Sequence, residues 1–258
     1  NSVTGMWGGA FSYWKGLTSV SIGSSVESIG GAAFYDCDGL TSVTIPNSVT
    51  SMRDDAFANC DGLTSVTIGN SVESIGTSAF SYCKGLTSVT IPNSVTSIGG
   101  AAFYDCIGLT SVTIGNSVKS IGIGAFSGCP ELLDVYCYAE DVPYTESDAF
   151  EGSYSENATL HVPAVSIESY DATAPWSGFE NIVAISTEGD GINYDFNAET
   201  KQATVIWKRG GEYSGSIVIP ESVEHEGTAY SVTSIGSSAF QDCDGLTSVT
   251  IPNSVTSI

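Results

Sequence analysis

Basic residues are scarce in this sequence. It contains 7 lysines and arginines against 29 aspartates and glutamates, which gives a formal net charge of −22 over 258 residues. A protein that binds nucleic acid or an anionic membrane surface presents a cluster of basic side chains. The only adjacent basic pair is Lys208 and Arg209. We therefore expect no nucleic-acid partner, and the negative charge favours solubility.

Long hydrophobic runs are also missing. The sequence has no run of about 18 apolar residues, so we expect no transmembrane segment in this chain. No basic-then-apolar leader opens it. Asn1 aligns with repeat asparagines such as Asn47, and the chain stops at Ile258 within another repeat. We interpret the chain as a segment of a longer array, with any targeting signal outside it.

Catalytic signatures are sparse as well. His161 and His225 are the only histidines, and neither has a patterned serine, cysteine or aspartate partner. The sequence contains no nucleophile-elbow motif and no His-Glu-x-x-His motif. We therefore expect no enzymatic activity and no cofactor, and we assign both histidines a surface or edge role.

The sequence is rich in one feature, a period of 23 residues. Cysteines, phenylalanines and leucines each recur at this step. The positions are Cys37, Cys60, Cys83, Cys106 and Cys129; Phe34, Phe57, Phe80, Phe103 and Phe126; and Leu40, Leu63, Leu86 and Leu109. A fixed period in the twenties is typical of a solenoid, in which each repeat forms one coil stacked on the last.

Each coil is predicted to contain two extended segments and a corner. The stretch from Ser42 to Ile45 alternates and is rich in β-formers, which predicts a short strand ending at Pro46. A second extended segment follows, in which Val49 and Met52 point inward. The Ala-Phe-x-x-Cys corner is too short for a full helix, so we expect a single helical or 3₁₀ turn.

A longer period of 46 residues overlies the first. The residue after the strand isoleucine alternates between proline and glycine, at Pro46, Gly69, Pro92 and Gly115. This alternation indicates that a pair of coils was duplicated.

Changes in the pattern divide the chain into three regions. Residues 1–130 are predicted to form a leucine-rich repeat solenoid. Residues 131–186 hold a degenerate repeat and a cap of the C-terminal type, and residues 187–258 hold a β-hairpin cap of the N-terminal type and the start of a second repeat block. A solenoid needs such caps because its end coils would otherwise expose their apolar faces.

The capping region has its own expected elements. Leu160–Pro163 is predicted to be a last strand, and Ser166–Asp171 a short amphipathic helix. Trp176 and Phe179 are expected to cover the open end of the solenoid, and the run from Ile182 to Ile185 to close it.

The units resemble leucine-rich repeats of the BspA-like class, found in surface and secreted proteins of host-associated bacteria. The matching string is Ile-Pro-x-Ser-Val-x-Ser-Ile-Gly-x-x-Ala-Phe-x-x-Cys-x-x-Leu, as at 91–109, and the pattern covers roughly 1–136 and 216–258. The resemblance implies a right-handed superhelix, β-rich with short helical turns. It also implies an extracellular or cell-surface location and adhesion to host proteins or glycans. The sequence departs from the general leucine-rich pattern in that Asn47 falls early.

The periodic cysteines and the aspartates beside them are candidate sites of a different kind. One coil offers one cysteine without a nearby histidine, so we expect buried free thiols rather than metal ligands. A disulfide between Cys129 and Cys137 is left open. Asp36 and Asp38 flank a cysteine, as do Asp242 and Asp244, but Lys84 occupies an equivalent position. We therefore expect solvated corners and no metal site.

The exposed face of the predicted strands is the best candidate for binding. Hydroxyl-bearing residues alternate with the inward residues and form ladders, namely Ser42, Thr44, Ser65, Thr67, Ser88, Thr90, Ser111 and Thr113. If the strands form one parallel sheet, these ladders line its surface, where hydroxyls can bind glycans or protein backbone. The alternative is that they only solvate the sheet. We predict a monomeric, non-enzymatic binding protein for host extracellular proteins or glycans; the alternative is a structural spacer array that presents other modules.

Overall fold

The computed structural model describes residues 4–153, 155–185, 192–206, 213, 215–225, 228–241, 243 and 245–258. The chain divides into two compact units, Asn1–Ala184 and Ile185–Ile258. Each unit has a hydrophobic core of its own. Within the described residues, no helix is long and apolar enough to cross a bilayer.

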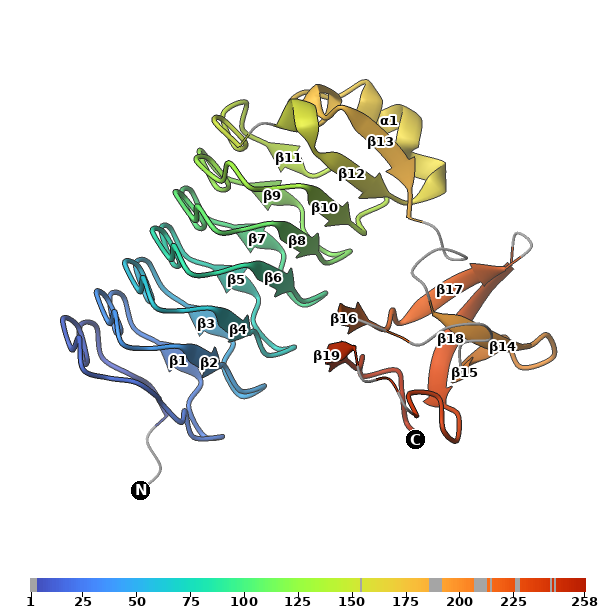
Figure 1. The fold of residues 1–258 in the computed structure, drawn as a ribbon, viewed down its shortest axis with the longest axis horizontal. Helices are drawn as coiled ribbons and strands as arrows, with labels where there is room; N and C mark the ends of the chain where they lie inside the picture. Colours follow the sequence, from blue (N-terminus) through green and yellow to red (C-terminus); the bar gives the residue numbers. More distant parts are fainter. Residues whose placement is uncertain are drawn as a thin grey trace. The chain divides into compact units, whose positions relative to one another are not determined.

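The first unit is a β-solenoid of about seven turns with a spacing of about 23 residues (Figure 1). One side is a six-stranded parallel sheet of two-residue strands. In order, these are β1 (Ser28–Ile29), β3 (Ser51–Met52), β5 (Ser74–Ile75), β7 (Ser97–Ile98), β9 (Ser120–Ile121) and β11 (Tyr144–Thr145). Register confirms the period, since Ser28 pairs with Ser51.

A second row of parallel strands carries the predicted binding face. Its members are β2 (Ser42–Thr44), β4 (Ser65–Thr67), β6 (Ser88–Ile91), β8 (Ser111–Ile114), β10 (Asp134–Cys137), β12 (Thr159–Val162) and β13 (Asn181–Ala184). The strands of this row do not all belong to one sheet. β2 pairs with β4 in one sheet, and β6, β8, β10, β12 and β13 form another.

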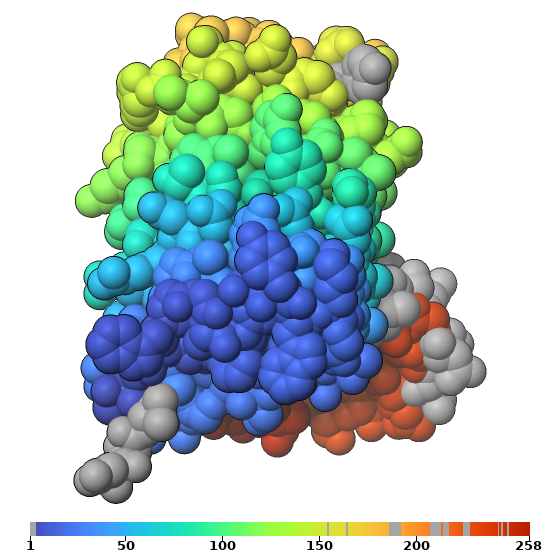
Figure 2. All heavy atoms as spheres, turned by 90° about the vertical axis from the view of Figure 1, so that its left-hand side faces the viewer, coloured from blue at the N-terminus to red at the C-terminus, as the bar shows by residue number. Residues whose placement is uncertain are grey.

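The core of the first unit is a stack of identical side chains. The periodic phenylalanine, cysteine and leucine are fully buried in every regular coil. From Phe11 to Phe150, successive phenylalanine rings lie 5.0–5.5 Å apart with interplanar angles of 10° or less. Figure 2 shows the coils from outside as successive bands from blue to yellow. Because each coil buries its faces only against its neighbours, the array supplies the stability that one coil lacks.

The predicted short turns form at the corners of the first unit, but they do not extend into a helix. Ala32 and Asp36 have φ values of 54° and 59°, in the left-handed region, and later coils repeat this pair. The N–H of Phe34 therefore donates to the carbonyl of Ala56 in the next coil at 2.8 Å, while that of Tyr35 bonds within its own turn. Every second corner amide thus links two coils, whereas a helix would use all of them internally.

The 46-residue period has a steric cause. A Cβ added to Gly69 would lie 2.6 Å from the carbonyl oxygen of Pro46, and one added to Gly115 would lie 2.7 Å from backbone atoms of Pro92. The glycine coil therefore approaches the backbone of the preceding proline coil too closely for any side chain. Asn47 Oδ1 also accepts the N–H of Asn70 at 2.8 Å.

Residues 155–184 cover one end of the stack. They form η1 (Ser155–Asn157), β12, η2 (Ala164–Ser166), α1 (Ile167–Asp171), η3 (Trp176–Gly178) and β13. Trp176 is fully buried and its ring packs edge-on against Phe150, 5.3 Å between centroids. Phe179 packs on the same ring at 5.2 Å. β12 is not the last strand, because β13 pairs with it in parallel.

The second unit is built around a four-stranded sheet in the order β14 (Asn193–Asn197), β15 (Gln202–Ile206), β18 (Thr228–Ile235), β17 (Ser222–His225). β14 and β15 form the predicted antiparallel hairpin. β16 (Gly215–Val218) pairs in parallel with β19 (Leu246–Thr250), as neighbouring repeat strands do.

Candidate binding surface

All eight predicted ladder residues point away from the core of the first unit. On β2 the pattern is exposed, buried, exposed, with Val43 inward between Ser42 and Thr44. The same alternation places Ser65, Thr67, Ser88, Thr90, Ser111 and Thr113 outward, exposed or half-buried. Registers align them, since Ser88 pairs with Ser111 and Thr90 with Thr113. The structure therefore provides a surface of hydroxyl groups along the strand row.

The eight hydroxyl-bearing residues are divided between two sheets. Ser42, Thr44, Ser65 and Thr67 belong to the β2–β4 sheet, whereas the other four lie on the sheet that begins at β6. β4 and β6 still contact each other in successive coils. A partner that follows the row would cross from one sheet to the other.

The strand face changes its chemistry at β10. Asp134 and Tyr136 occupy the positions that are Ser111 and Thr113 in the preceding strand. On β12, His161 pairs in register with Tyr136. The two rings stack with centroids 4.1 Å apart and an interplanar angle of 11°. His161 Nε2 lies 2.9 Å from Asp134 Oδ1. His161 on β12 therefore contacts both Asp134 and Tyr136 on β10.

We call Asp134, Tyr136 and His161 the Asp-Tyr-His cluster. The side chain of Asp134 is 44% exposed and that of His161 is 20% exposed. Burial, with a smaller contribution from the carboxylate of Asp134, raises the pKa of Tyr136, so its hydroxyl stays protonated at neutral pH. The cluster combines an aromatic face, a carboxylate and a phenol at one end of a hydroxyl-lined sheet.

This cluster was not predicted from the sequence. We expected only a surface or edge role for His161 and no role for Asp134 or Tyr136. A signal was present, because Asp134 and Tyr136 lie 23 residues after Ser111 and Thr113 and replace small hydroxyl residues on the exposed face. His161 was harder to place, since its register partner Tyr136 is 25 residues away.

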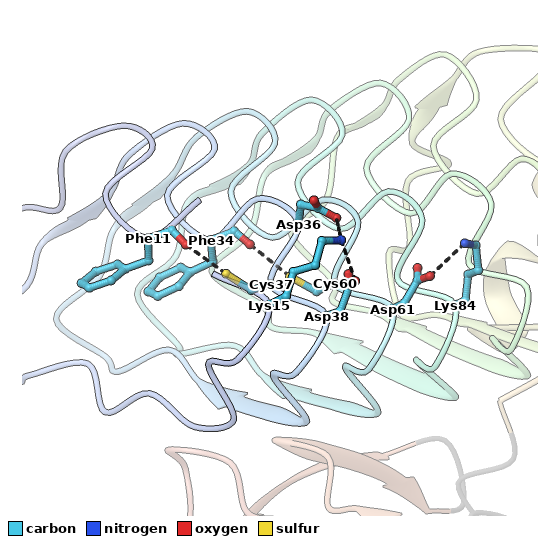
Figure 3. A network of polar contacts seen from close by, with 9 residues as sticks. All are labelled: Phe11, Lys15, Phe34, Asp36, Cys37, Asp38, Cys60, Asp61 and Lys84. Atoms are coloured by element: carbon cyan, nitrogen blue, oxygen red, sulfur yellow. Dashed lines mark hydrogen bonds and ion pairs between the residues drawn. The ribbon is translucent and has the colours of Figure 1, made fainter. Parts of the chain in front are cut away.

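The periodic cysteines are free and buried, as predicted. Each thiol donates to a phenylalanine carbonyl of the preceding coil, as Cys37 does to Phe11 at 3.1 Å and Cys60 to Phe34 at 3.1 Å (Figure 3). Burial raises the pKa of Cys60 to about 12. Cys129 and Cys137, left open as a pair, are both free. These thiols hold coils together and are poor nucleophiles.

Lysines of neighbouring coils pair with three of the corner aspartates. Lys15 Nζ lies 2.8 Å from Asp38 and 3.0 Å from Asp36, and Lys84 lies 3.0 Å from Asp61 (Figure 3). Hydrogen bonds to Asp38 and Asp36 raise the pKa of Lys15. Among the residues that the structure describes, no group of three or more histidine, cysteine or acidic side chains could hold a metal ion.

Three residues considered in the sequence analysis have no described side chain. Asp242 and Asp244, and the side chain of His225, lie outside the described residues.

The repeat geometry agrees with a known family model. The model for the BspA type leucine rich repeat region, with 6 copies, matches residues 6–133, 52–171 and 217–258. These matches cover more than half of the sequence. The chain belongs to the BspA-type leucine-rich repeat family. In this BspA-type chain, the stacked Phe, Cys and Leu positions form the structural framework.

This BspA-type chain also resembles solved structures. A leucine rich cell surface protein from Faecalibacterium prausnitzii is 26% identical, with a TM-score of 0.54, over 98% of this chain and 66% of that one. The pneumococcal vaccine antigen PcpA is 18% identical, with a TM-score of 0.53, over 64% of this chain and 40% of its own length. The latter similarity shows the fold alone. No curated protein matches the sequence.

Proposed function

We propose that this chain is a non-enzymatic binding module of a bacterial cell-surface or secreted protein. Its ligand is a host extracellular protein or glycan, which lies along the exposed face of β2, β4, β6, β8, β10 and β12. The family and the cell-surface description of the Faecalibacterium protein support this location.

The observation that carries the proposal is the contrast between the two faces of this strand row. Inward residues such as Val112 are fully buried and repeat from coil to coil. From β2 to β12 the outward residues are polar and exposed or half-buried, and the Asp-Tyr-His cluster lies at the end of this stretch. On β13 the exposed Val183 follows His161 in register. Solenoids characteristically use an extended face of this kind to bind partners.

A catalytic role has less support from the geometry. Asp134 and His161 form a hydrogen-bonded pair, which could orient a general base. No hydrogen bond joins His161 to a serine, threonine or cysteine side chain among the residues that the structure describes. The pair therefore lacks the side-chain nucleophile that covalent catalysis of the Ser-His-Asp type requires.

The proposal is tested by a binding screen of the purified chain against host matrix proteins and polysaccharides. For any saturable hit, Thr67→Tyr and Thr90→Tyr place bulky rings on the face and are expected to abolish binding. Thr77→Tyr is the matched control, because Thr77 is exposed at a corner. Binding that survives both face substitutions would move the site elsewhere on the chain.

A structural spacer remains the second candidate function. The unbroken phenylalanine stack and the uniform Ser/Thr ladders favour it, because a rigid rod needs regular coils and no specific ligand. A screen without any saturable hit would support this function over binding.

A further inference from the structure

Charge is distributed unevenly along the first unit. Residues 4–130 contain 8 acidic and 4 basic residues, a difference of −4. Residues 131–184 contain 4 aspartates and 7 glutamates but no lysine or arginine, a difference of −11. His161 is the only side chain of this segment that can become a cation near neutral pH. The cap end is therefore the strongly anionic part of the solenoid.

Part of this charge lies beside the strand face. Asp134 is the first residue of β10, Glu131 lies three residues before it, and Glu180 directly precedes β13. Glu131 and Glu180 are exposed. Because β10, β12 and β13 run parallel, their starts lie at the same edge of the sheet. This edge presents carboxylates to any partner that reaches the end of the hydroxyl row.

The Asp-Tyr-His cluster has one ring face and one carboxylate oxygen available. His161 covers one face of the Tyr136 ring. The register partner on the other side is Thr113, whose small side chain cannot cover an aromatic ring. Asp134 Oδ1 is engaged by His161, and Oδ2 has no hydrogen-bond partner among the described residues.

A guanidinium group fits these two features together. Arginine stacks on an aromatic face and donates to a carboxylate at the same time. A charge-assisted hydrogen bond from the guanidinium would occupy Asp134 Oδ2, the carboxylate oxygen that His161 does not hydrogen-bond. The surrounding negative charge would draw a basic segment to the site and raise its association rate.

We propose that the cap end of the strand face docks a basic segment of a partner protein, with an arginine held between the Tyr136 ring and the Asp134 carboxylate. This inference rests on the proposed function and narrows it to a cationic protein ligand. Neutral glycans fit the hydroxyl ladders but would leave the carboxylates of Glu131 and Glu180 at this edge of the sheet without a cationic partner. A flat, exposed sheet also suits an extended protein segment, and tyrosine is a frequent anchor of protein interfaces.

The experiment uses the full chain and a fluorescent peptide of glycine, serine and threonine that carries several arginines. Fluorescence anisotropy gives the dissociation constant. The matched peptide replaces each arginine by citrulline, which keeps the shape and removes the charge. We expect binding of the arginine peptide to weaken with added salt, and the citrulline peptide to bind at least about tenfold more weakly.

Variants then separate the cluster from general attraction. Asp134→Asn and Tyr136→Leu are each expected to weaken arginine-peptide binding about tenfold. Tyr136→Phe is expected to retain most of it, because the ring remains. Glu73→Gln is the control, since it removes one exposed carboxylate next to β5 on the opposite sheet, and it should change affinity less than about twofold.

Three results would overturn the inference. The first is equal binding of the arginine and citrulline peptides. The second is an equal effect of Asp134→Asn and Glu73→Gln, which would mean unspecific attraction by net charge. The third is a hit in the binding screen that Thr67→Tyr and Thr90→Tyr abolish but Asp134→Asn leaves unchanged. In this third case, binding on the strand face would stand and only the arginine site would be refuted. Apart from these three results, an absence of binding in both experiments would refute the proposed function together with the arginine site.

Discussion

The buried thiol ladder leads to a sharp prediction for Cys83. Its side chain is fully buried, and Sγ donates to the carbonyl oxygen of Phe57 at 3.2 Å. Cys83→Ala deletes one buried heavy atom, which costs about 1 kcal/mol. It also leaves a buried carbonyl without this donor, at roughly 1 kcal/mol or more. We expect the alanine variant to lose about 2 kcal/mol of unfolding free energy.

Serine should be the better replacement, and the chain itself shows why. Ser153 occupies the cysteine position in the coil that precedes the cap, and its hydroxyl donates to the carbonyl of Phe126. It also accepts the N–H of Cys129 at 2.9 Å. A hydroxyl can therefore replace the thiol as donor in this corner. Cys83→Ser is expected to cost about 1 kcal/mol less than Cys83→Ala.

The assay is urea unfolding of the full chain under reducing conditions. Fluorescence follows Trp176, which is buried at the cap of the first unit, and far-ultraviolet circular dichroism follows the strands. The free energy is compared only between variants with equal m-values, because repeat arrays can lose cooperativity. A serine variant as unstable as the alanine variant, or less stable, would refute the hydrogen-bond argument. The thiol would then act only as a small hydrophobic group.

Three further predictions follow from the coil geometry. Gly69→Ala should lose about 2 kcal/mol or more of unfolding free energy, because its Cβ would meet backbone atoms. Gly23→Ala should be nearly neutral, because nothing lies within 4 Å of the added Cβ. Equal losses in the two variants would contradict the steric explanation. Trp176→Ala should cost about 3–5 kcal/mol and expose the cap end, which urea unfolding and dye binding would detect; an unchanged midpoint would contradict a capping role. Cys60 and Cys129 have pKa values raised by burial to about 12, so they stay protonated when the unfolded thiols ionise. The stability that they contribute is complete below about pH 9 and is lost as pH rises toward about 12, and a midpoint independent of pH in this range would contradict it.

The inward half of the fold could be predicted because stacking repeats the same requirement in every coil. A residue such as Phe80 contacts its equivalents Phe57 and Phe103, so one coil determines the environment of the next. The strand at Ser42 and the inward positions Val49 and Met52 followed from this period. The corner was only partly predicted, because every second amide there bonds to the next coil. Such backbone hydrogen bonds have no signature in the pattern of hydrophobic side chains.

Of the candidate site, the sequence predicted the hydroxyl ladders but not the Asp-Tyr-His cluster. The hydroxyl ladders have the same register as the core, so alternation alone placed Thr67 and Thr90 on the exposed face. The Asp-Tyr-His cluster joins residues that are 25 and 27 positions apart, where the period has already changed. Once an insertion shifts the spacing, only three-dimensional register shows which side chains face each other.

Regularity itself points to where function should be sought in this chain. Stacking constrains the inward residues, and the outward positions of the strand row are free of this constraint. Where the outward positions remain serine and threonine, one coil offers a partner nothing that the next does not, so the ladders can align a ligand but cannot fix its position. Asp134, Tyr136 and His161 break the repetition on the exposed face without any demand from the core. A partner that binds at one place along the row therefore has to be positioned by this end of it.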